Sequence, residues 1–238
     1  MTPSIAIAII VFLAILTQAI AGSGLALIAM PLLVEILDPL TAASLVALMA
    51  ITTQLIMLAR YRQSLSAQGL WRLMVGSLLG IPIGIYALSQ LDEQVILTVL
   101  GLVLISYVAI NLFTLPLPPF RNANWGFGFG FLSGMLGGAY NTGGPPFVIY
   151  GLSQKWEPQR FKANLQLLLM VNSFTVVMAH LVAGHYTSEV LQNYLLALPM
   201  ILLGAFTGFW IDRYINEVVF RRVVLVVLLI IGLRMLFS

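Results

Sequence analysis

Glycines and small polar residues interrupt two apolar stretches of the chain, and their types suit them to bind an anion. The first interruption is Gly22-Ser23-Gly24, and the second is Asn141-Thr142-Gly143-Gly144. A helix that begins after such a break exposes free backbone N–H groups and the positive end of its dipole. In a low-dielectric setting these groups hold an oxyanion without a cationic side chain. We therefore predict substrate contacts at Ser23, Gly24, Asn141, Thr142, Gly143 and Gly144; the alternative is that small residues serve only close helix packing.

Polar side chains inside the longer apolar segments are the second set of candidates. Asn164 and Asn172 lie within 160–183, Thr53 lies within 40–59, and Gln18 precedes the first interruption by one helical turn. Amides are costly in lipid, so they must face protein or water. We predict that these four residues line the substrate site. The alternative is hydrogen bonding between helices, worth about 0.6 kcal/mol on average.

Few charged or titratable groups lie near these segments. Lys162, one turn inside a helix, either attracts anions at an inner vestibule or extends its ammonium to the membrane interface. Glu35, Asp38 and His180 are candidates for carrying a coupled proton, because they lie near predicted helix ends and histidine titrates near neutrality.

Catalytic and metal-binding patterns are missing from the sequence. Cysteine is absent, and the two histidines, His180 and His185, stand alone. There is no HExxH motif, phosphate-binding loop or serine with a plausible histidine base. We expect no enzyme activity, no metal site and no cofactor.

Composition places the chain in a lipid bilayer. Apolar residues make up 61% and charged residues 8% of the 238 residues, against about 45–50% and 25% in soluble domains. These values exclude soluble and disordered classes. The net charge of +3 comes from few residues with no basic run, which excludes nucleic acid as a partner.

The apolar segments predict an all-α protein. Continuous runs near 20 residues are typical of membrane helices and not of barrel strands. Two segments, 25–36 and 146–153, are too short to span a hydrocarbon core of about 30 Å. The segments fall at 4–21, 25–36, 40–59, 70–90, 94–114, 125–140, 146–153, 160–183, 190–211 and 218–237.

Two repeats are visible along the chain. A shift of 119 residues places Gly22-Ser23-Gly24 on Asn141-Thr142-Gly143, and a shift of 124 places Gly80 on Gly204 and Gly84 on Gly208. We predict a first membrane repeat at 1–114, a proline-rich linker at 115–124 and a second repeat at 125–238.

The basic residues predict the topology. Eight plain crossings would put five basic residues on one side and six on the other, against the positive-inside bias. If 4–36 and 125–153 are re-entrant hairpins, ten of the eleven share one side and Arg234 lies opposite. Each repeat is then a re-entrant helical hairpin plus three transmembrane helices. The repeats are inverted, with both termini outside the cytoplasm. Irregular backbone at membrane depth must be buried or line a wet cavity, so we expect the two tips to meet near the midplane, as in transporters.

These glycine motifs resemble those of the TauE/SafE family, also called the sulfite exporter or TSUP family. The first copy is Gly22-Ser23-Gly24 with Pro31. The second is Gly134-Met135-Leu136-Gly137-Gly138, followed by Gly143-Gly144-Pro145-Pro146. The resemblance covers nearly the whole chain and implies export of sulfite, a sulfonate or a related small anion.

The combined expectation is a secondary transporter in the cell inner membrane. It exports a small sulfur-containing or organic anion by alternating access, with the site between the two hairpin tips and with protons as the coupled ion. The alternative is a channel-like pore for anions or neutral solutes, without a coupling ion. The sequence leaves the oligomeric state open.

Overall fold

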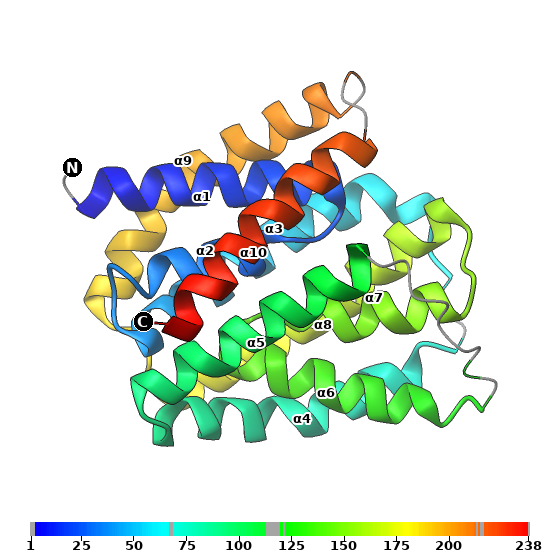
Figure 1. Cartoon of the computed structure of the whole chain (residues 1–238), viewed down its shortest axis with the longest axis horizontal. Coiled ribbons are helices and arrows are strands. Elements are labelled where there is room, and N and C mark those ends of the chain that lie inside the picture. The colour runs from blue at the N-terminus through cyan, green and yellow to red at the C-terminus, as the bar shows by residue number, and fades with distance from the viewer. Residues whose placement is uncertain are drawn as a thin grey trace. The chain divides into compact units, whose positions relative to one another are not determined.

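Helices account for all the regular structure in the described part of the chain (Figure 1). The computed structural model describes residues 3–66, 69–112, 120, 122–212, 214 and 217–237. Most of the predicted linker lies outside these ranges, as do Arg121 and Arg213. The first half contains α1 (Pro3–Ala21), α2 (Leu25–Leu33), α3 (Pro39–Tyr61), a 3-10 turn η1 (Arg62–Ser64), α4 (Trp71–Gln90) and α5 (Glu93–Leu112). The second half contains α6 (Trp125–Tyr140), α7 (Gly144–Ser153), α8 (Pro158–Val182), α9 (Ser188–Ile211) and α10 (Glu217–Phe237).

Helix length and composition confirm an all-α membrane protein. Among the described residues, five helices are long and apolar enough to cross a bilayer: α1, α3, α4, α8 and α9. The helix α2 has nine residues and α7 has ten, about 14–15 Å at 1.5 Å per residue. Both are therefore too short to span alone.

Local sequence explains where the long helices begin. The Asp38 carboxylate accepts the N–H groups of Leu40 and Thr41 at 3.1 and 3.0 Å, which caps the start of α3. The start of α8 has a proline at its first position, where no N–H is needed.

The chain forms two compact units, and each unit combines segments from both halves of the sequence. Unit 1 comprises Met1–Val46, Gln90–Leu115 and Ser188–Ser238, and therefore contains α1, α2, α5, α9 and α10. Unit 2 comprises Ala47–Ser89 and Pro116–Thr187, and contains α4, α6, α7, α8 and most of α3.

Within unit 1, α1 packs in parallel along α9. A Cβ atom at Gly204 would lie 3.0 Å from the Phe12 carbonyl oxygen and from Ile15 Cβ. One turn later, a Cβ at Gly208 would lie 3.1 Å from the Leu16 carbonyl oxygen. The residue numbers on the two helices rise together, so the helices run in the same direction.

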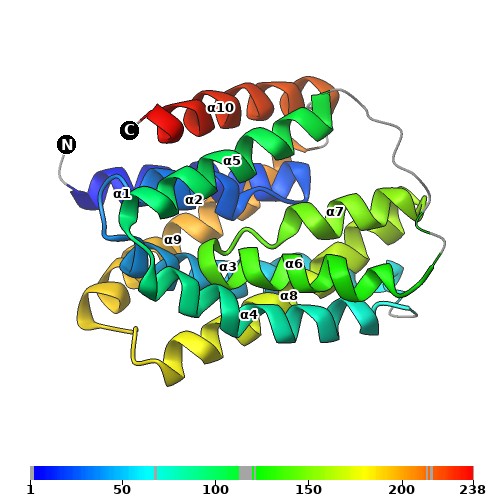
Figure 2. The same ribbon diagram turned by 60° about the horizontal axis from the view of Figure 1, so that its bottom comes forward.

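The other helix pair of unit 1, α5 and α10, is antiparallel, and Figure 2 shows the two helices side by side. A Cβ at Gly101 would lie 2.9 Å from the Gly232 carbonyl oxygen and 3.3 Å from Leu236. A Cβ at Gly232 would lie 3.1 Å from both Leu104 and Ile105. Along the contact, residue numbers increase on α5 in the direction in which they decrease on α10, so the two helices run in opposite directions.

Within unit 2, glycines bring α4 and α6 into backbone contact. A Cβ at Gly80 would collide with the Phe131 carbonyl oxygen, and one at Gly84 would collide with the Met135 carbonyl oxygen. The helices run in parallel. Such close approach is typical of small residues at membrane helix interfaces.

The two parallel pairs make contacts at corresponding positions. Gly80 and Gly204 are 124 residues apart, and their neighbours Phe131 and Phe12 are 119 apart. These are the two shifts that relate the predicted repeats. The α4–α6 pair in unit 2 therefore corresponds, contact for contact, to the α9–α1 pair in unit 1.

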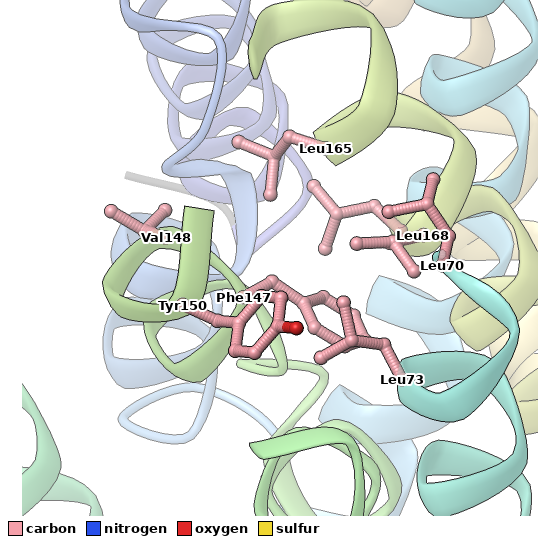
Figure 3. Close-up of a cluster of buried hydrophobic side chains, with 8 residues drawn as sticks. Leu70, Leu73, Phe147, Val148, Tyr150, Leu165 and Leu168 are labelled. Atoms are coloured by element: carbon pink, nitrogen blue, oxygen red, sulfur yellow. The ribbon is translucent and has the colours of Figure 1, made fainter. Parts of the chain in front are cut away.

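Large apolar side chains fill unit 2 beside α7 (Figure 3). Phe147 and Leu168 are both 1% exposed, and burial of such side chains contributes about 1.5–3 kcal/mol each. This cluster anchors α7 against α8. Its members are Leu70, Leu73, Phe147, Val148, Tyr150, Leu165, Leu168 and Leu169.

Candidate functional site

The first break between helices, in unit 1, depends on glycine. Gly22 has φ 74° and Gly24 has φ 132°, both in the region that L side chains rarely adopt. The Gly22 N–H donates to the Gln18 carbonyl oxygen at 2.9 Å, which closes α1. Ser23 and Gly24, at the tip, remain partly exposed.

The Gln18 side chain links this tip to the start of α2. Its Oε1 accepts the Leu25 N–H at 3.1 Å, and the residue is 2% exposed. The Nε2 of the same amide is buried without a hydrogen-bond partner. An amide N–H₂ group that can donate two hydrogen bonds is thus held at a helix N-terminus.

Backbone donors lie at the same place. The first intrahelical bond of α2 runs from the Ile28 N–H to the Gly24 carbonyl oxygen at 3.1 Å. The N–H groups of Ala26 and Leu27 come before it and have no intrahelical acceptor. Together with Gln18 Nε2 and the positive end of the α2 dipole, they favour an anionic ligand.

The second break, in unit 2, begins with a left-handed residue that is not glycine. Asn141 has φ 55° and ends α6, and its N–H donates to the Gly137 carbonyl oxygen at 2.8 Å. Asparagine tolerates this conformation better than most residues. The Thr142 N–H and hydroxyl both donate to the Leu136 carbonyl oxygen, at 3.2 and 3.4 Å.

Backbone donors are scarcer in the first turn of α7 than in the first turn of α2. Pro145 and Pro146 occupy the first turn of α7 and carry no N–H. Gly144 supplies the N–H of that turn ahead of them. The prolines therefore leave the first turn of α7 with fewer N–H groups than the first turn of α2.

Asn172 lies beside the second tip. Its Nδ2 donates to Ser77 Oγ at 3.0 Å and to the Ser133 carbonyl oxygen at 3.4 Å, and the residue is 4% exposed. The Ser133 hydroxyl donates to the Gly143 carbonyl oxygen. The amide fills the space beside Gly137, where a Cβ would collide with it. These bonds connect α4, α6, α8 and the tip.

Sequence reasoning did not identify Ser77 and Ser133. Both stand next to a glycine, Ser77 in α4 and Ser133 in α6. The usable signal was a hydroxyl among glycines at a close helix contact.

The other predicted residues do not join this group. Asn164 lies two turns before Asn172 on α8, its Oδ1 accepts the Ser66 N–H at 3.1 Å, and its Nδ2 is buried without a partner. The Thr53 hydroxyl donates to the Met49 carbonyl oxygen of its own helix at 2.7 Å. Lys162 is half-buried near the start of α8.

The two histidines are paired, contrary to the reading of each as standing alone. Their Nδ1 atoms lie 2.8 Å apart at the end of α8. Five residues separate them, and the turn that ends the helix brings them together.

Comparison with known protein families assigns the chain. Residues 7–235 match the family described as "Sulfite exporter TauE/SafE". No curated protein and no solved structure gave a match. The match spans both hairpins and all the long helices, and members of this family are membrane transporters and not enzymes. The chain belongs to the TauE/SafE sulfite exporter family.

Proposed function

We propose that this protein is a secondary transporter that exports a small sulfur-containing or organic anion, such as sulfite or a sulfonate, by alternating access. The observation that carries this proposal is the first tip. There a buried, unpartnered amide donor lies at the N-terminus of α2, next to backbone N–H groups that the helix cannot pair. This arrangement suits the oxygens of a small oxyanion.

The donors described at this tip, Gln18 Nε2 and the N–H groups at the start of α2, are neutral, and this suits transport. Neutral donors hold an anion through hydrogen bonds worth about 1.5–3 kcal/mol each. Such contacts bind an anion without trapping it. That Asn141, Thr142, Gly143 and Gly144 hold the same anion stays a prediction.

We further propose the inverted-repeat topology, in the inner membrane with both termini outside. The matched contacts of Gly80 with Phe131 and of Gly204 with Phe12 support two related halves. The antiparallel α5–α10 pair also supports it, because eight plain crossings would make these helices parallel.

An ion pair in unit 1 gives independent support. Arg234 Nη2 lies 2.7 Å from Glu35 Oε2. Eight plain crossings would put these residues at opposite membrane faces, whereas the hairpin topology puts both outside. The pair also accounts for Arg234, the basic residue on the side opposite to the other ten, because its charge is balanced there.

The length of α1 sets a condition on this topology. The helix has 19 residues and is about 28 Å long, close to the thickness of the hydrocarbon core. A re-entrant α1 must therefore tilt or begin outside the core. The short α2 then returns to the side from which α1 entered.

Binding of sulfite to purified full-length protein tests the first tip. Gln18→Glu keeps the oxygen that accepts the Leu25 N–H but replaces the Nε2 donor with a carboxylate oxygen, which repels an anion. Calorimetry should show a ten- to hundredfold weaker Kd. Gln18→Met, which removes both amide atoms at similar volume, is the second variant in case the buried carboxyl prevents folding. Gln63→Glu on the exposed turn η1 is the matched control.

Two outcomes would overturn the proposal. Wild-type affinity in folded Gln18→Glu and Gln18→Met would remove the first tip from the site. Flux into proteoliposomes that rises linearly with sulfite, accompanied by single-channel conductance, would identify a pore and not a carrier.

A further inference from the structure

The turn between α8 and α9 ends α8 with a well-defined cap. Gly184 has φ 72°, and its N–H donates to the Leu181 carbonyl oxygen at 3.1 Å. The His185 N–H donates to the His180 carbonyl oxygen at 3.0 Å. These two bonds form a Schellman motif, in which the side chains at the positions of His180 and His185 meet.

An apolar contact frequently accompanies this motif, but here two imidazoles take its place. The Nδ1 atoms of His180 and His185 lie 2.8 Å apart, and the ring centroids are 5.1 Å apart. At this distance one Nδ1 must carry a hydrogen and the other must accept it. His180 is 0% exposed, whereas His185 is half-buried and reaches the surface.

A tyrosine lies beside the pair. The Tyr186 ring lies 6.3 Å from that of His180, and its hydroxyl donates to the Val177 carbonyl oxygen at 3.3 Å. Burial raises the pKa of Tyr186, so this hydroxyl stays neutral in the range where histidine titrates.

Among the described residues of unit 2, apolar side chains pack on this part of α8. Within unit 2, Ala47, Ile81 and Ile85 form an apolar cluster with Val176 of α8, and Tyr86 is exposed. Of the described carboxylates of unit 1, Asp38 lies before α3, Asp92 after α4 and Glu189 in the first turn of α9. In unit 2, Glu157 precedes α8 at the end of the helix opposite to His180.

We infer that His180 and His185 form a proton-binding site that controls the α8–α9 turn. When one Nδ1 donates its hydrogen to the other, the two neutral rings hold the cap closed. A proton taken from water by the accepting Nδ1 makes both Nδ1 atoms donors and makes one ring a cation. The hydrogen bond then breaks, and the turn loosens.

This site lies on the helix that carries Asn172. Its state therefore bears on the second tip through α8, and under the hairpin topology it samples the pH outside the cell. The inference about proton binding itself does not depend on the transported solute.

The protein's composition allows a clean test. These are the only two histidines in the sequence, so His180→Leu/His185→Leu removes every side chain with an ordinary pKa between 5 and 8. It also restores the apolar contact usual in this motif. Equilibrium unfolding of the full-length protein in mixed micelles should be compared at pH 7.5 and 5.5.

Proton uptake by the unfolded chain sets the direction in which the unfolding constant changes with pH. Unfolded histidines bind protons below about pH 6.5, while a proton bound by the folded pair breaks its hydrogen bond. Between pH 7.5 and pH 5.5, the unfolding constant of the wild type should therefore rise about tenfold for each histidine that stays neutral in the folded protein. The double variant should show no such rise. His185→Gln, whose amide oxygen accepts from His180 at any pH, should show a smaller rise than the wild type.

Hydrogen exchange of the 180–187 amides locates the effect. After correction for the intrinsic rate, exchange should accelerate at pH 5.5 in the wild type and not in the double variant. An identical pH dependence of unfolding in both proteins would overturn the inference. Neither measurement involves an anion. The inference about the histidine pair can therefore fail while the transport proposal stands.

Discussion

Gly24 has a backbone conformation that a side chain would strain. Its φ is 132°, and a Cβ there would also lie 3.2 Å from Thr17 Cγ2. Gly24→Ala should lower the free energy of unfolding by about 1–3 kcal/mol. Thermal or SDS unfolding measures this loss. Gly128→Ala is the control, because no atom lies within 4 Å of a Cβ at this helical position, and alanine there should stabilise α6 by up to about 1 kcal/mol. Equal stability of the two variants would contradict this role for Gly24.

Asn172 acts on the second tip through its hydrogen bonds. Asn172→Ala should lower stability by about 1–3 kcal/mol, since it leaves buried groups of Ser77 and Ser133 without their partner. A double-mutant cycle with Ser77→Ala should give a coupling energy of about 0.5–3 kcal/mol. Additive effects of the two changes would contradict the bond between these side chains.

Residue types alone indicated part of the candidate site. Glycines and small polar residues marked both tips, and the cost of amides in lipid marked Gln18 and Asn172. The partners could not be predicted, because Asn172 meets Ser133 and Ser77 across 39 and 95 residues of sequence. The unpaired Nε2 of Gln18 depends on a side-chain orientation that only the folded hairpin fixes.

At the level of elements, glycine stripes set how closely the parallel helices approach. In α4, a Cβ at Gly80 meets backbone atoms of Phe131, whereas at the corresponding Gly204 of α9 it meets Ile15 and Phe12 at about 3.0 Å. Gly80→Ala should therefore cost more stability than Gly204→Ala, with both near the 1–3 kcal/mol typical of overpacking. Unfolding of the two variants beside Gly128→Ala measures the order. A larger loss at Gly204 would contradict the packing described for α4 and α6.

The existence of every predicted helical segment is confirmed, but the ends of the short ones differ. The segment predicted at 25–36 is helical only to Leu33, because the N–H groups of Ile36 and Leu37 both donate to the Leu33 carbonyl oxygen in a turn. The segment predicted at 146–153 begins earlier, at Gly144, since two prolines fit a first helical turn. Hydropathy places such helices, whereas local hydrogen bonding fixes their ends.

For the whole molecule, repeat and charge together argue for inversion. In each compact unit, a hairpin helix of one half of the chain packs on a long helix of the other half. The helix α1 of the first half packs on α9 of the second, and α6 of the second half packs on α4 of the first. The hairpins are thus held by the opposite half of the chain. Neither half should fold alone, because its hairpin would lack the glycine-lined partner helix.

The membrane orientation can be measured directly, because the protein contains no cysteine. Glu35→Cys and Arg234→Cys introduce single thiols at two exposed positions that are 2.7 Å apart in the native ion pair. In intact cells, both should react with a membrane-impermeant maleimide, since the hairpin topology places both outside. Gln63→Cys, on the exposed turn η1, should react only after permeabilisation. The ion pair is exposed and worth only about 0.2–1 kcal/mol, so its loss should leave the fold intact. Labelling of Glu35→Cys and Arg234→Cys from opposite sides would indicate eight plain crossings. Each half would then cross the membrane an even number of times, and the two repeats would not be inverted.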